Sequence, residues 1–167
     1  MPIVFLSFGS NQGDRAKQCR TAIEHIKERC QATVKKVSSF YESEAVGPPG
    51  QENHINLAVE VETDLPPMSL LRGIREIETL MGRRKLVKWG PREIDIDVLM
   101  YGDLVMRSDA LTIPHLLMHE RMFVLAPLSE IAPDVVHPLL GKTVSQIFRD
   151  CKDAHWVRKL KEKVVEV

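Results

Sequence analysis

The sequence predicts an α+β fold, a sheet with helices packed on it, formed by a single domain that covers residues 1–167. The first observation is bulk composition: 167 residues, 44% hydrophobic and 28% charged, suit one globular domain with a core. The second is the succession of apolar patterns, which alternate between period two and period 3.6 in the order β-α-β-β-α-β. A hairpin and C-terminal helices follow. This succession is that of a ferredoxin-like sheet, in which we expect the first and fourth strands to be central and the helices to cover one face.

Each element of the first half has its own signal. Residues 3–8 form a short apolar run, typical of a buried strand. Residues 15–29 place an apolar stripe at helical spacing behind Asp14, a plausible N-cap. Branched and aromatic residues predict a strand over 33–41, and clean alternation predicts another over 54–62.

The second half begins with a helix after residue 64, because two prolines are tolerated in a first turn and apolar residues then recur to Met81. A strand is predicted over 94–98. The turn at Gly102-Asp103 predicts a hairpin whose second strand covers 104–106. Two helices are expected at the C-terminal end, over residues 123–131 and 143–150, and the tail that follows them has no assigned role.

Composition excludes several classes of protein. The 23 basic and 23 acidic residues give zero net charge, which argues against a nucleic-acid binder. The three cysteines are far apart and odd in number, so they predict neither a zinc site nor a disulfide framework. The N-terminus does not resemble a signal peptide, and no apolar run approaches the ~20 residues of a membrane helix. We therefore expect a cytoplasmic protein.

The strand predicted at 94–98 carries two carboxylates, Asp95 and Asp97, between branched apolar residues. Because strand side chains alternate, both aspartates share one face while the apolar residues bury against the other. Two carboxylates this close repel each other unless a cation joins them. A hard divalent ion such as Mg²⁺, which also binds nucleotide phosphates, prefers oxygen ligands. The alternative is that the pair lies on the wet face of a half-exposed strand.

A run of positive charge precedes this strand. Residues 83–92 contain five cations and no acid: Arg83, Arg84, Lys85, Lys88 and Arg92. Cations next to a carboxylate pair suggest a polyanion held between them, with metal on one side and guanidinium on the other.

Other polar residues have two interpretations each. Asn56 is either a loop cap or an amide that reads the donor and acceptor edge of a heterocycle. Glu78 is either a solvated acid or one that points into the site. His115 and His119 have the spacing of a zinc pair on a helix, but no third ligand is obvious.

The segment Trp89-Gly90-Pro91-Arg92-Glu93-Ile94-Asp95-Ile96-Asp97-Val98-Leu99-Met100-Tyr101-Gly102-Asp103 closely resembles the signature of the 6-hydroxymethyl-7,8-dihydropterin pyrophosphokinase family of folate biosynthesis. The resemblance covers nearly the whole chain, including residues 6–11, 38–41, 46–48, Pro114-His115 and Phe123. It implies a ferredoxin-like fold and transfer of pyrophosphate from ATP to the hydroxymethyl group of the pterin, which releases AMP. It also implies a monomer that binds neither nucleic acid nor membrane.

The resemblance implies a role for each matching position. Asp95 and Asp97 would bind two Mg²⁺ ions that bridge the triphosphate, and Arg83 and Arg92 would stabilise the transferring phosphates. Trp89 would act as a lid. The residues that would contact the pterin are Ser43, Val46, His54, Asn56, Trp89 and Phe123. The residues that would contact ATP are Glu78, Arg84, Trp89, Val98, Thr112, His115 and Arg121.

The sequence departs from the family pattern at three positions. His54 stands where an aromatic often stacks on the second face of the pterin, Leu116 where a tyrosine is common, and Ala110 where an arginine sometimes reaches the nucleotide. Two other functions share parts of this pattern: a different two-metal phosphoryl or nucleotidyl transferase, and a non-catalytic small-molecule sensor.

Overall fold

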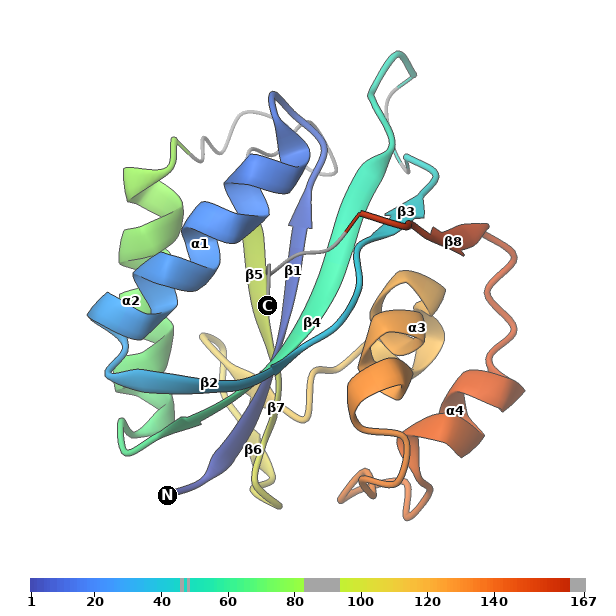
Figure 1. Cartoon of the computed structure of the whole chain (residues 1–167). Coiled ribbons are helices and arrows are strands. Elements are labelled where there is room, and N and C mark those ends of the chain that lie inside the picture. The colour runs from blue at the N-terminus through green and yellow to red at the C-terminus, as the bar shows by residue number, and fades with distance from the viewer. Residues whose placement is uncertain (46, 48, 83–93, 163–167) are drawn as a thin grey trace.

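The computed structural model describes residues 1–45, 47, 49–82 and 94–162, and in this part a six-stranded antiparallel sheet lies between two layers of helices (Figure 1). One layer contains α1 (Arg15–Arg29) and α2 (Pro67–Leu80). The other contains α3 (Met122–Ile131) and α4 (Val144–Asp150). None of the helices in the described ranges has the length and apolar character needed to cross a membrane.

The sheet has the strand order β5-β1-β4-β3-β8, and β2 pairs with the other end of β4. These strands are β1 (Ile3–Ser10), β2 (Ala32–Val37), β3 (Tyr41–Ser43), β4 (His54–Thr63), β5 (Asp95–Tyr101) and β8 (Val157–Lys159). Two short strands, β6 (Met106–Arg107) and β7 (Thr112–Ile113), pair separately, and a 3₁₀ turn η1 (Met118–Glu120) precedes α3.

The prediction of a mixed sheet-and-helix fold is confirmed, and several elements begin and end as predicted. The helix over 15–29 has the predicted bounds, and the Asp14 side chain accepts a hydrogen bond from the Lys17 N–H, as expected of an N-cap. The strand predicted over 33–41 is instead divided into β2 and β3. The hairpin prediction was also wrong in its pairing, because β6 pairs with β7 and not with β5.

The predicted position of the aspartate strand was wrong: β5 lies at the edge of the sheet, and β1 and β4 are the central strands. The outer edge of β5 is nevertheless hydrogen-bonded. The Ile96 N–H donates to Glu78 Oε2 of α2 at 3.0 Å, and the His115 N–H donates to the Leu99 carbonyl at 2.8 Å. The Glu78 side chain and the loop at His115 therefore hydrogen-bond to backbone groups that a neighbouring strand would pair with if β5 were central.

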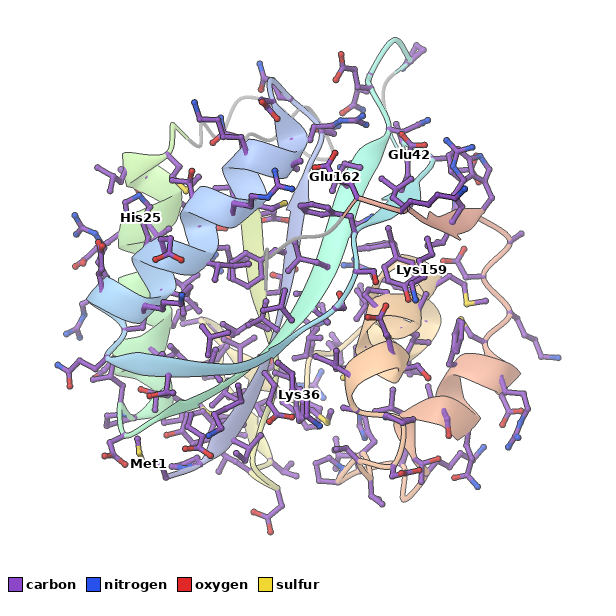
Figure 2. All side chains as sticks on the ribbon, viewed as in Figure 1. Met1, His25, Lys36, Glu42, Lys159 and Glu162 are labelled. Atoms are coloured by element: carbon purple, nitrogen blue, oxygen red, sulfur yellow. The ribbon has the colours of Figure 1, made fainter. Side chains whose placement is uncertain are left out.

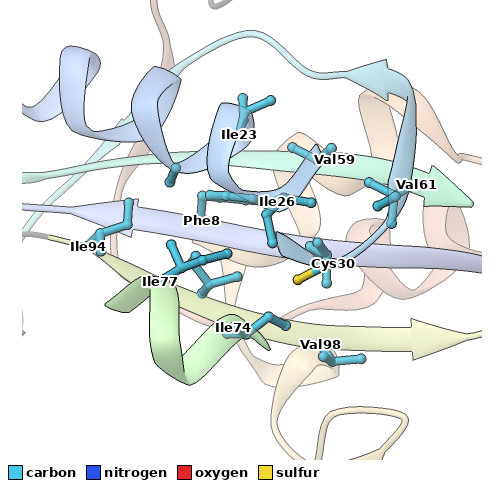
Figure 3. Close-up of a cluster of buried hydrophobic side chains, with 14 of the residues drawn as sticks. Phe8, Ile23, Ile26, Cys30, Val59, Val61, Ile74, Ile77, Ile94 and Val98 are labelled. Atoms are coloured by element: carbon cyan, nitrogen blue, oxygen red, sulfur yellow. The ribbon is translucent and has the colours of Figure 1, made fainter. Parts of the chain in front are cut away.

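The expectation that helices cover one face was also wrong. α1 and α2 cover the face formed by alternate residues such as Phe8, Val59 and Val98 (Figure 3). α3 packs on the opposite face, against Phe5 and Ala58. α3 buries the apolar side chains at one end of that second face, whose exposure to water would be unfavourable.

A partly exposed polar contact holds α3 against the sheet. The Tyr41 hydroxyl of β3 donates to Glu130 Oε1 of α3 at 2.7 Å, and the Ser39 N–H donates to Oε2 at 2.9 Å. Lys159 Nζ of β8 lies 3.6 Å from Glu130 Oε1. Figure 2 shows Lys159 beside α3. Burial and the neighbouring Glu130 raise the pKa of Tyr41, so its hydroxyl stays protonated and remains a donor.

We expect Tyr41→Phe to lower the free energy of unfolding by about 1 kcal/mol, because it removes one hydrogen bond to a charged acceptor without creating a cavity. Urea denaturation monitored by circular dichroism measures this change. Lys159→Ala is the matched control. It removes a largely exposed partner of the same carboxylate and should cost less than about 0.5 kcal/mol. Equal losses in the two variants would contradict a special role for Tyr41.

Candidate functional site

Asp95 and Asp97 lie on the same face of β5, as predicted from the alternation. The pairing of β5 with β1 places Asp97 opposite Ser7 and Asp95 opposite Gly9. The pairing of β1 with β4 then places Gly9 opposite Asn56. Asp95, Gly9 and Asn56 therefore form one row across three strands, on the face opposite α1 and α2. Because neighbouring strands are about 4.8 Å apart, Asp95 and Asn56 are separated by roughly 10 Å.

Gly9 matters because it adds no side chain between the acid and the amide. A Cβ atom at this position would lie 3.2 Å from Asn56 Oδ1, closer than ordinary van der Waals contact. Asn56 is buried, and its Nδ2 donates to Ser43 Oγ at 2.7 Å. His54, two residues earlier on β4, shares this face and pairs with Ser43 in the sheet. The predicted pterin-contacting residues Ser43, His54 and Asn56 are thus brought together.

The surroundings of the aspartate pair disfavour a negative charge on Asp97. Burial first, and then the nearby carboxylates of Asp95 and Glu78, raise the pKa of Asp97 to about 7, although Arg121 and Arg75 oppose the rise. A neutral pH therefore does not fully ionise Asp97 without an added positive charge. An oxygen-seeking cation bound to both aspartates would remove this penalty, so the donor set fits a divalent metal such as magnesium.

The number of protein ligands also fits that ion. In the part of the chain that the structure describes, no three His, Cys, Asp or Glu side chains are placed to hold a metal together. Magnesium commonly binds one or two carboxylates and completes its coordination with water or phosphate, so a pair of aspartates suits it. Among the described residues, His115 and His119 likewise have no third side chain placed to complete a zinc site.

Glu78 is fully buried on α2 and is not a solvated acid. Its Oε2 accepts the N–H of Ile96, the residue between the two aspartates, and its Oε1 pairs with Arg75. These contacts fix the edge of the strand that carries the site. Sequence reasoning missed Arg75, although its i,i+3 spacing to Glu78 on a predicted helix is a signal that favours such a pair.

Arg121, Phe123 and His115 form a second group. The Arg121 guanidinium carbon lies 5.6 Å from the centre of the Phe123 ring. The charge of Arg121 acts on both Asp97 and His115. Burial, reinforced by Arg121, lowers the pKa of His115 to about 4, so its ring is neutral near pH 7, and its Nδ1 accepts the Leu117 N–H. Arg121, which precedes α3, is therefore a residue whose charge acts on both the aspartate pair and His115.

For the remaining predicted residues that it describes, the structure gives burial or a neighbouring strand. Val98 is buried on the α1 and α2 face, so a contact with ATP would use its backbone. Thr112 begins β7, which lies against β5. Leu116 and Ala110, where the sequence departs from the family pattern, are exposed. The predictions for Arg83, Arg84, Trp89, Arg92 and Val46 fall outside the described residues.

Comparison with known proteins identifies the family. The sequence model described as 7,8-dihydro-6-hydroxymethylpterin-pyrophosphokinase matches residues 5–133. The 2-amino-4-hydroxy-6-hydroxymethyldihydropteridine pyrophosphokinase of Aquifex aeolicus is 42% identical over 146 residues, which cover 87% of this chain and 90% of the relative. The protein of the same name from Bacillus subtilis is 42% identical over 133 residues, 80% of each chain.

Solved structures show the same fold at low identity. A crystal structure described as HPPK-DHPS in complex with substrates has a TM-score of 0.70 and 16% identity, over 89% of this chain. HPPK-DHPS of Plasmodium falciparum has a TM-score of 0.67 and 18% identity, again over 89% of this chain. In both cases the matched region is only 43% of the solved chain. From the family match and the two bacterial relatives, the chain belongs to the 7,8-dihydro-6-hydroxymethylpterin-pyrophosphokinase family.

Proposed function

We propose that this protein transfers the β,γ-pyrophosphoryl group of ATP to the hydroxymethyl oxygen of 6-hydroxymethyl-7,8-dihydropterin. The products are AMP and the pterin diphosphate, an intermediate of folate biosynthesis. The observation that carries the proposal is the row of Asp95, Gly9 and Asn56 on one sheet face, with Asp97 beside it. This arrangement places two carboxylates that can bind a metal and one buried amide on the same surface. The chain that carries them belongs to the pyrophosphokinase family.

We assign the metal sites to Asp95 and Asp97, with two Mg²⁺ ions. When bound, these ions supply positive charge that orients the triphosphate and offsets charge on the attacking and leaving oxygens. The protein's own contribution is to hold the two carboxylates on one face of β5. Glu78 supports this geometry by accepting the Ile96 N–H between them.

The pterin side of the proposed site is built from Asn56, Ser43, His54 and Phe123. Asn56 offers both a donor and an acceptor, which suits the edge of a pterin ring. Its amide is oriented by the hydrogen bond to Ser43 Oγ. Phe123 would stack on one face of the ring, and His54 would contribute less than a larger aromatic on the other. The backbone of Ser43 and Val46 would complete the recognition.

The ATP side is assigned to Glu78, Arg84, Trp89, Val98, Thr112, His115 and Arg121. The positive charge of Arg121 already acts on Asp97, so Arg121 is suited to balance phosphate charge at this site. Arg83 and Arg92 are proposed to stabilise charge that develops during transfer, and Trp89 to exclude water from it. We propose that the chain works as a monomer in the cytoplasm.

Product analysis tests the proposed reaction. The protein is incubated with ATP, Mg²⁺ and 6-hydroxymethyl-7,8-dihydropterin, and the nucleotides are separated by chromatography. We expect AMP and the pterin diphosphate in equal amounts, only when all three components are present. Release of pyrophosphate instead would indicate a nucleotidyl transferase, and failure to bind Mg–ATP would indicate a sensor module.

We expect Asp97→Asn to reduce AMP formation on the order of a hundredfold or more, because one metal ligand loses its charge. Pterin affinity, measured by calorimetry without nucleotide, should stay within about threefold of wild type because the amide side of the site is intact. Asp103→Asn, at an exposed position just beyond the strand, is the matched control and should be fully active. A rate for Asp97→Asn within a few-fold of wild type would discard this role.

We expect Phe123→Ala to weaken pterin binding by about tenfold or more, because stacking and buried aromatic area are lost. The affinity for Mg–ATP should change little. Titration calorimetry with each ligand alone measures both effects. The reverse pattern, with weaker nucleotide binding and unchanged pterin binding, would show that Phe123 does not stack on the pterin.

A further inference from the structure

The start of α3 is held by a residue far along the chain. The N-cap residue Arg121 makes no capping hydrogen bond with its side chain, so the first N–H groups of the helix need another acceptor. The Met122 N–H donates to Asp153 Oδ2 at 3.0 Å. Asp153 thus supplies, from beyond α4, the cap that the local sequence of α3 lacks.

The Asp153 carboxylate is itself fixed in place. Its side chain is only 8% exposed, and its Oδ1 accepts the His155 N–H at 3.0 Å and lies 2.5 Å from His155 Nδ1. Burial alone would raise the pKa of Asp153, but the hydrogen bonds from His155 and Met122 outweigh it and lower that pKa. The group is therefore an anion at neutral pH, and it faces the positive end of the helix dipole.

The same C-terminal segment also holds the other side of the pterin site. The Trp156 N–H donates to Glu44 Oε1 at 3.0 Å, and Val157 pairs with Ser43 across β3 and β8. Ser43 in turn accepts the hydrogen bond from Asn56. Residues 153–157 therefore connect the strand that orients Asn56 to the helix turn that carries Arg121 and Phe123. This segment lies outside residues 5–133, the region matched by the family.

We propose that Asp153 is a positioning residue for the pterin site. By capping α3 at Met122 it sets where Arg121 and Phe123 stand relative to Asp97 and Asn56. The residue touches neither substrate and acts through the first turn of α3. This inference rests on the proposed function, which identifies the pterin as the ligand. The hydrogen bond by which Asp153 caps α3 does not depend on the proposed function.

The test compares Asp153→Ala and Asp153→Asn with the wild-type chain of 167 residues. We expect Asp153→Ala to raise the dissociation constant for 6-hydroxymethyl-7,8-dihydropterin about five- to tenfold, because a lost cap loosens the first helical turn. Asp153→Asn keeps an acceptor oxygen and should give an intermediate loss. At saturating pterin the rate should recover to within about threefold of wild type.

Hydrogen exchange at the Met122 amide supplies a readout that does not depend on activity. It should be fastest in Asp153→Ala, intermediate in Asp153→Asn and slowest in wild type, in the same order as the pterin dissociation constants. Asp150→Ala is the matched control. It removes a carboxylate three residues away that pairs with exposed Lys142, and it should change neither quantity.

Three results would overturn the proposal: unchanged pterin affinity in folded Asp153→Ala, an equal loss in Asp150→Ala, or a loss of rate that saturating pterin does not recover. If Asp153→Ala does not fold, Asp153→Asn decides alone, since faster Met122 exchange with unaltered pterin affinity contradicts the inference. If wild type fails to bind the pterin, the proposed function fails, while Met122 exchange still reports whether Asp153 caps α3.

Discussion

Two carboxylates held on one face of an edge strand are the constraint on which the rest of the structure depends. Asp95 and Asp97 repel each other, and the buried Glu78 adds a third negative group nearby. Such an arrangement costs free energy unless positive charge is supplied. Arg75 and Arg121 supply part of it from within the described structure. We propose that a metal-bound triphosphate supplies the remainder.

The two faces of the sheet serve different purposes. One face is mostly apolar and packs against α1 and α2, so it fixes the register of β1, β4 and β5. That register determines which residues form rows on the opposite face. There α3 covers the apolar end, while the end with Asp95, Gly9 and Asn56 keeps its polar groups. The position of α3 depends on Glu130, held by Tyr41, and on Asp153 at its first turn.

Local periodicity was enough to predict much of the fold. The bounds of α1, the shared face of Asp95 and Asp97, and the apolar face of β4 all follow from patterns within one element. The membership of the family was predicted from the segment at residues 89–103 together with matching positions along nearly the whole chain. These features need no knowledge of distant contacts, because spacing along a helix or strand already fixes which side chains share a face.

What sequence reasoning missed depends on contacts between distant segments. The edge position of β5 is possible only because Glu78 and the loop at His115 satisfy its backbone. β8 exists only as a partner of β3, and no pattern in residues 157–159 distinguishes it from a tail. Asp153 has no local signal as the cap of a helix that begins at Met122. Each of these requires the three-dimensional arrangement before it can be recognised.

The most direct test of the account is a carbon-13 NMR titration of the aspartate carboxyl groups, with and without Mg²⁺ and a non-hydrolysable ATP analogue. Without ligands, we expect the pKa of Asp97 to be raised, to about 7, because burial and the neighbouring carboxylates disfavour its charge. With metal and nucleotide bound, that pKa should fall well below its unliganded value. An ordinary pKa in the unliganded protein, or one that does not change on binding, would contradict the central claim.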